Sequence, residues 1–128
     1  MVGDFSLFLA GDALITRPWS HVYDPAFLRL IEEIRAADIS IANLETVIHE
    51  FKGYAQRDSG GTHMASPPAI AAELKWAGFD MAIHANNHAF DYGSSAILET
   101  LEHVGEAGLV LASRWTTWTA TSTSTSTR

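Results

Sequence analysis

The feature that most constrains the fold is a regular alternation of short apolar runs and longer amphipathic segments along the chain. Runs of this length, rich in Leu, Ile, Phe and Ala, are typical of buried strands. The intervening segments repeat apolar residues at helical spacing. We therefore predict the order β-α-β-α-β-α-β, an α/β fold with parallel strands and helices packed on the sheet. The predicted strands are Phe5–Ala10, Ile39–Ala42, Asp80–His84 and Leu109–Leu111.

The three predicted helices have recognisable starts and ends. Asp24-Pro25 and Ser66-Pro67 each join a capping side chain to a proline that suits the first helical position. The third helix is predicted from about Ser94 to Ala107. Gly78 and Gly108 follow the second and third helices and are expected to end them.

Polar side chains stand at the ends of the first three predicted strands. Asp12 follows the first strand, Asn43 and Glu45 follow the second, and Asn87 and His88 follow the third. Because the carboxyl ends of parallel strands open on one edge of a sheet, we expect these side chains to converge there. Carboxylate, amide and imidazole groups together suit divalent ions such as Mg²⁺, Mn²⁺, Fe²⁺ or Zn²⁺.

Such a site has a plausible chemistry. A divalent ion polarises a phosphoryl oxygen and activates water. A nearby histidine, His88, is placed to donate a proton to the leaving group or to bond a phosphate oxygen. Asp91, three residues further on, is placed to orient that ring.

Each of these residues also has a purely structural interpretation. Asp12 after a glycine suits a turn, and Glu45 alone suits a solvated loop. Asn43 and Asn86 are residue types that tolerate left-handed turns. We expect His84, within the third strand, to pack in the core rather than to line the site. The residues alone thus indicate an α/β domain with either a metal or a phosphate site.

Composition narrows the classes of partner. The chain has 128 residues, a formal net charge of −7 and no cysteine, which excludes disulfides, thiolate zinc sites and thiol nucleophiles. The acidic balance argues against nucleic acid or an anionic membrane as the main partner. No apolar run reaches the roughly 20 residues of a membrane helix, and Asp4 stands where a signal peptide carries positive charge. We therefore expect a cytoplasmic location.

Two segments depart from the alternation. Residues 50–66 are polar and Gly-containing and are predicted to form a long loop, and loops of this length are often functional. Residues 113–128 alternate Ser and Thr, and they suit either a disordered tail or a frameshifted or prematurely ended sequence. We accordingly divide the chain into a domain over residues 1–112 and a tail over residues 113–128.

Several stretches resemble the CapA family of poly-γ-glutamate capsule biosynthesis proteins. They are GDALITR (Gly11 to Arg17), ADISIANLET (Ala37 to Thr46) and GFDMAIHANNHAFDYG (Gly78 to Gly93), and the resemblance runs from Phe5 to Ala112. The family is similar to calcineurin-like metallophosphoesterases, which have paired sheets flanked by helices and a two-metal site. The resemblance implies the N-terminal half of such a sandwich.

The resemblance also implies residue roles. Asp12, Asn43, Glu45 and Asn87 would be metal ligands, and His88 with Asp91 would be catalytic. Asn86 would support the substrate site, and Arg17 would either contact an anionic substrate or form a structural salt bridge. The implied cofactor is a divalent metal (Mn, Mg, Fe or Zn), with two ions in the full-length parent. The implied substrate is phosphorylated or related to polyglutamate, and a capsule-synthesis complex is the implied partner.

This chain departs from the phosphoesterase pattern in two ways. Ala13 and Leu14 follow Asp12 where a histidine is usual, and the later histidine motifs and the second sheet are absent. A half-sandwich would leave apolar surface uncovered and a sheet edge open, which predicts aggregation or partnering.

Our leading hypothesis is a truncated CapA-family protein with a partial phosphoesterase-like metal site, the fragment itself being inactive. The alternative is a non-catalytic binding or scaffold module in a polymer-synthesis complex. A third hypothesis, a nucleotide-binding domain, lacks the Gly-rich phosphate loops that would support it.

Overall fold

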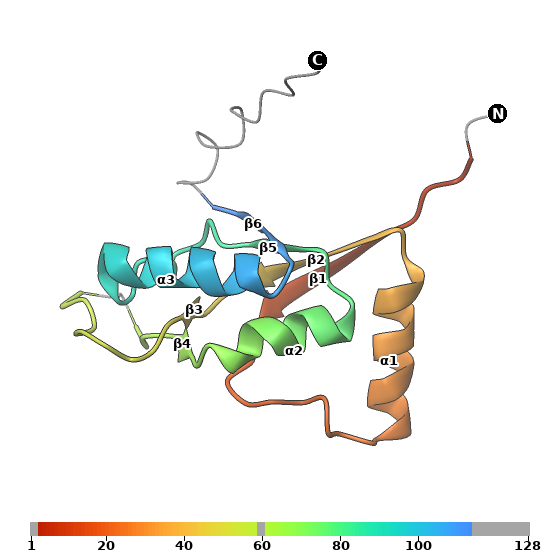
Figure 1. Ribbon diagram of the computed structural model, residues 1–128, viewed down its shortest axis with the longest axis horizontal. Helices are drawn as coiled ribbons and strands as arrows, with labels where there is room; N and C mark the ends of the chain where they lie inside the picture. Colours follow the sequence, from red (N-terminus) through yellow and green to blue (C-terminus); the bar gives the residue numbers. More distant parts are fainter. Residues whose placement is uncertain (1–2, 59–60, 114–128) are drawn as a thin grey trace, which may run out of the picture.

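A computed structural model describes residues 3–58 and 61–113 and has the predicted α/β architecture (Figure 1). Four parallel strands form one sheet in the order β1-β2-β5-β6. Three helices connect them, as the sequence predicts. In chain order the elements are β1 (Leu7–Ala13), α1 (Pro25–Ala36), β2 (Ile39–Leu44), β3 (Val47–Ile48), β4 (Ala65–Ser66), α2 (Ala69–Ala77), β5 (Met81–Ile83), α3 (Gly93–Glu106) and β6 (Val110–Ala112).

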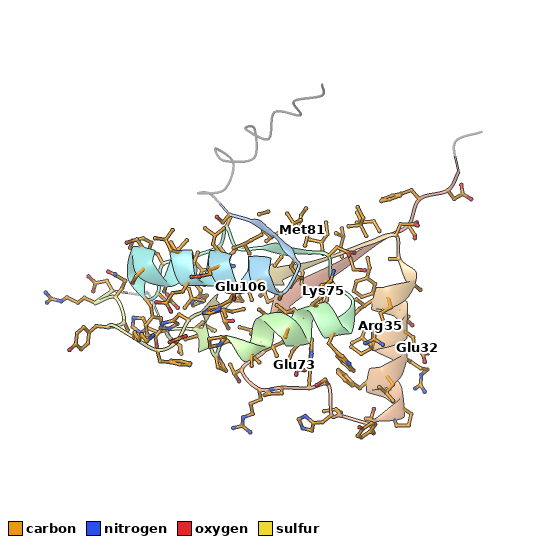
Figure 2. All side chains as sticks on the ribbon, in the orientation of Figure 1. Glu32, Arg35, Glu73, Lys75, Met81 and Glu106 are labelled. Atoms are coloured by element: carbon orange, nitrogen blue, oxygen red, sulfur yellow. The ribbon has the colours of Figure 1, made fainter. Side chains whose placement is uncertain are left out.

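All three helices lie on one side of the sheet (Figure 1). The strand order explains this, because each right-handed crossover steps in the same direction and so places its helix on the same face. The opposite face is apolar and exposed: Leu9 is 67% exposed, Val110 is 59% exposed, and Leu7 and Ile83 are also exposed. Met81 lies on this open face, away from the helices (Figure 2). The predicted uncovered apolar surface is present in the described residues.

The core lies between the sheet and the helices. Ile31 and Ile34 of α1 and Ile70 and Leu74 of α2 are all buried there. Gly78 ends α2 in the left-handed region, with φ of 105°, and a Cβ at this position would lie 2.6 Å from Arg35 Cγ. Both the backbone conformation and the close approach of α1 therefore require glycine, which confirms the predicted helix end.

The observed boundaries correct two of the expectations. The first strand is shifted and runs to Ala13, with an irregularity in its pairing between Leu9 and Asp12, so Asp12 lies within β1 rather than after it. The predicted Ser66 cap on α2 is wrong. The helix begins at Ala69 after Pro68, which makes no side-chain cap bond.

Ser66 instead belongs to β4, which pairs with β3 in a small parallel sheet that the sequence pattern did not predict. Its hydroxyl donates to Ile15 O at 2.6 Å and lies 2.8 Å from Thr46 Oγ1, within hydrogen-bonding distance. These bonds attach the end of the long loop to the main body. The two interpretations of the Ser/Thr tail fall on residues 114–128, which lie outside the described residues. No helix in the described part of the chain is long and apolar enough to cross a membrane.

Candidate functional site

The structure brings the side chains at the strand ends together in one hydrogen-bonded group. Asp12 and Asn43 are paired in register across β1 and β2, which places them on the same face at the carboxyl end of the sheet. The Asn43 amide Nδ2 donates to Asp12 Oδ1 at 2.7 Å and to Glu45 Oε2 at 2.6 Å. One amide therefore holds two carboxylates close together. Asp12 is exposed, whereas Glu45 is only 9% exposed.

Asn86 connects this pair of strands to the segment after β5. Its Nδ2 donates to Asn43 Oδ1 at 3.1 Å and to Leu44 O at 2.8 Å, so both amide hydrogens are used. Its Oδ1 accepts from His88 N at 3.1 Å. The side chain predicted to support the substrate is thus a structural bridge between two strand ends.

His88 is held by a buried carboxylate. Its Nδ1 lies 2.8 Å from Oδ2 of Asp91, which is 2% exposed. Because a carboxylate only accepts, Nδ1 carries the hydrogen, and Nε2 faces Glu45 Oε1 at 3.8 Å, beyond hydrogen-bonding distance. Asp91 Oδ2 also accepts from Met64 N at 2.6 Å. The carboxylate therefore fixes both the histidine ring and the end of the long loop. We call the connected side chains the strand-end network: Asp12, Asn43, Glu45, Asn86, His88 and Asp91.

Two of the predicted site residues lie outside this network. Asn87 is exposed, and its side chain has no hydrogen bond to any residue that the structure describes. Arg17 is exposed in the loop between β1 and α1, also without an ion pair in the described part of the chain. The backbone of the Asn87–His88 pair thus presents the histidine to the network and the asparagine to solvent.

The loop that carries Arg17 is fixed by Glu73 of α2, a contact that the sequence analysis missed. The Glu73 carboxylate accepts from Trp19 N at 3.0 Å, from Ser20 N at 2.7 Å and from Ser20 Oγ at 2.9 Å. Burial on its own would raise the pKa of Glu73, but these three bonds together lower it. Figure 2 shows Glu73 on the side of α2 that faces this loop. Nothing in the helical pattern distinguishes it from a solvated glutamate.

His84 lies beside the network as well as in the core. It is 1% exposed, as expected for a packed histidine, and its Nδ1 lies 2.9 Å from Leu44 O. It also lines a pocket that Asn86 shares. Burial lowers its pKa, with smaller opposing effects from the bond to Leu44 O and from the Glu45 charge.

The strand-end network contains oxygen donors of the kind that hard cations bind. Among residues 3–58 and 61–113, no three His, Asp or Glu side chains are grouped in a way that could hold a metal ion. Asp12 and Glu45 supply carboxylate oxygens of the kind that Mg²⁺ and Mn²⁺ prefer, and water would complete their coordination. The Asn43 Nδ2 group donates to both carboxylates. The described residues therefore offer two carboxylates that would hold an ion, without a third His, Asp or Glu ligand grouped with them.

Comparison with known proteins identifies the family. The model of the bacterial capsule synthesis protein family PGA_cap matches residues 6–112. The chain belongs to this family. The match confirms the CapA resemblance drawn from the GDALITR, NLE and ANNHAFDYG stretches and covers every element of the sheet. It also covers all six residues of the strand-end network.

Two relatives of this chain are the uncharacterized proteins y4sH and y4uA of Sinorhizobium fredii (strain NBRC 101917 / NGR234). Each is 34% identical to it over 115 residues. The alignment covers 88% of this chain but 25% of each relative. The chain thus spans about a quarter of the length of these relatives.

Proposed function

We propose that this chain carries part of a metal-dependent phosphoesterase-like site that acts in capsule or poly-γ-glutamate synthesis. The strand-end network is the observation that supports this proposal. It gathers two carboxylates, two amides and a carboxylate-oriented histidine at the carboxyl edge of a parallel sheet, where ligands of α/β proteins bind. The fold and the donor set support a phosphoester substrate class, and the substrate would be phosphorylated or related to polyglutamate.

Each side chain would have a distinct task. Asp12 and Glu45 would hold a divalent ion, which when bound would neutralise phosphate charge and lower the pKa of water. Asn43 orients both carboxylates through its amide. His88, fixed at Nδ1 by Asp91, presents Nε2 toward Glu45 and so toward the place where a phosphate would lie. When both ring nitrogens carry a hydrogen, Nε2 would donate to a phosphate oxygen or pass its proton to the leaving group.

The proposed site is partial. Because the chain spans about a quarter of its relatives, ligands for a second ion would come from sequence outside the matched quarter. We propose that the activity belongs to the longer protein and that the 128-residue chain alone holds one ion weakly. Exposed Asn87 and Arg17 would then serve as additional contacts to the second ion or to the substrate.

Manganese binding to the chain tests this proposal directly. A site filled at ten times its Kd adds about 1.4 kcal/mol of stability. For a domain of this size that is a rise of roughly 5–10 °C in Tm. We expect Mn²⁺ to raise the Tm of the native chain and to leave the Tm of Asp12→Asn and Glu45→Gln unchanged. Glu32→Gln, a charge-matched control on α1 (Figure 2), should retain the full rise.

The lack of a three-ligand cluster among the described residues favours one alternative, a non-catalytic binding or scaffold module in a polymer-synthesis complex. A Tm that does not respond to Mn²⁺ or Mg²⁺ in the native chain would support this alternative and refute the metal site. A rise of equal size in the native chain and in Asp12→Asn would refute the assigned ligands.

A further inference from the structure

A pocket adjoins the strand-end network on the helical side of the sheet. It has a volume of about 640 Å³ and lies between the segment after β5 and helix α3. Ala89, Phe90 and Ile97 give it apolar walls. His84, Asn86 and Ser113 supply polar groups. The described residues that line it include no Lys, Arg, Asp or Glu. An ionic ligand would therefore lose its hydration without gaining a counter-charge.

His84, one of the residues that line this pocket, has an unused hydrogen-bond acceptor. Its Nδ1 donates to Leu44 O at 2.9 Å, because a carbonyl oxygen only accepts. Burial lowers its pKa, so the ring is neutral near pH 7 and Nε2 has a free lone pair. Nε2 is buried and has no hydrogen-bond partner among the residues that the structure describes. A buried acceptor without a partner is costly, which suggests that a bound group satisfies it.

The Asn86 side chain, which also lines the pocket, does not compete for such a ligand. Asn86 uses both of its amide hydrogens on Asn43 Oδ1 and Leu44 O, and its Oδ1 already accepts from His88 N. Of the side-chain nitrogen and oxygen atoms of His84 and Asn86, His84 Nε2 is thus the one without a hydrogen bond among the described residues. His84 Nε2 is matched to a ligand group that donates one hydrogen bond, and Ala89, Phe90 and Ile97 are matched to an apolar part of the same ligand.

We propose that this pocket binds a small uncharged organic group that carries a hydroxyl or N–H donor, which bonds to His84 Nε2 while its apolar part packs on Phe90 and Ile97. Pockets of this size, apolar with a few placed polar groups, are typical of small-molecule sites. This inference does not rest on the phosphoesterase proposal, because no metal ligand takes part. Asn86 nevertheless joins the two sites, so a bound group would lie next to the Asp12–Asn43–Glu45 edge.

Three probes of similar size separate the interactions: phenol has a ring and a donor, toluene has the ring alone, and benzoate adds a negative charge. Titrations of the ¹⁵N-labelled native chain, followed by amide shifts, would report both affinity and location. We expect phenol to give saturable shifts centred on residues 84–90 and Ile97. Phenol should bind about threefold to tenfold more tightly than toluene, the value of one net hydrogen bond. Benzoate should bind more weakly than either.

Two variants assign the site. His84→Leu should abolish the preference for phenol over toluene, and Leu44 O retains its bond from Asn86 in this variant. Ala89→Leu fills the pocket and should abolish binding of both probes, whereas Ala72→Leu on the exposed face of α2 should change nothing. Equal affinities of phenol and toluene in the native chain would refute the acceptor role. Phenol shifts that persist in Ala89→Leu would refute the pocket. The comparison of probes in the native chain decides the first question even if His84→Leu fails to fold.

Discussion

Replacement of Asp91 tests the central contact of the strand-end network. Its Oδ2 accepts from His88 Nδ1 at 2.8 Å and from Met64 N at 2.6 Å in a position that is 2% exposed. Hydrogen bonds to a charged group contribute about 1.5–3 kcal/mol each, so Asp91→Ala should lower the free energy of unfolding by about 3–6 kcal/mol. Domains of this kind have about 5–15 kcal/mol in total. The alanine variant should therefore be close to unfolding at 25 °C.

Urea denaturation followed by circular dichroism measures this loss. Asp91→Asn keeps an oxygen that can accept both hydrogens but removes the charge. Its free energy of unfolding should be about 2 kcal/mol below that of the native chain. Asp38→Ala is the matched control, because Asp38 also accepts two hydrogen bonds, from Ser6 N and Ser6 Oγ, but in an exposed position. Water can replace the exposed Asp38 carboxylate, so Asp38→Ala should lower the free energy of unfolding much less than Asp91→Ala does. The reasoning fails if Asp91→Ala and Asp38→Ala have the same urea midpoint, or if Asp91→Asn loses as much as Asp91→Ala.

Three further predictions concern the rest of the fold. Thr100→Val should lower the urea-derived free energy of unfolding by about 1–3 kcal/mol, because Ile48 N loses its buried acceptor at 2.9 Å. Thr100→Ser keeps the hydroxyl and should retain most of the native free energy of unfolding. Burial lowers the pKa of His49 in the folded chain, and the Glu99 charge opposes this effect. Because the unfolded chain then binds more protons than the folded chain, the free energy of unfolding should fall as pH drops from about 6.5 through the pKa of folded His49. His49→Leu should reduce that dependence in urea midpoints measured at several pH values, and an unchanged slope would exclude His49 as its source. Leu9→Lys should reduce concentration-dependent association in sedimentation experiments without loss of helical signal, and a native chain that is monomeric at all concentrations would contradict this expectation.

The topology could be predicted because the apolar runs, the helical spacing and the helix-end signals of the sequence all indicate the same fold. Four short apolar runs separated by amphipathic segments leave few alternatives to a parallel sheet. The strand ends then place Asp12, Asn43 and Glu45 at one edge without any knowledge of their contacts. Their convergence follows from topology alone, and the observed hydrogen bonds agree with it. Cap and proline signals located α1, whose Asp24 side chain accepts from Ala26 N and Phe27 N.

Contacts between distant segments could not be predicted from local pattern. The β3–β4 pairing joins two strands of two residues each, too short for any periodicity to show. Ser66 resembles a helix cap in sequence, but its hydroxyl has better partners in Ile15 O and Thr46 Oγ1. Glu73 resembles a solvated helix residue until the β1–α1 loop folds back on it. In each case a tertiary hydrogen bond overrides a local preference.

The strand order also relates the open face to the candidate site. Asp12 and Asn43 are in register beyond Leu9 and Ile41, and the alternation of exposure along β2 puts Asn43 on the same open face as Ile41. The carboxylate pair is therefore a polar end to an otherwise apolar surface. A surface that covered Leu9 and its neighbours would also bound the space around Asp12 and remove water from it, which would strengthen every electrostatic interaction there. The exposed apolar face and the proposed carboxylate site thus lie together on the side of the sheet that the helices leave open.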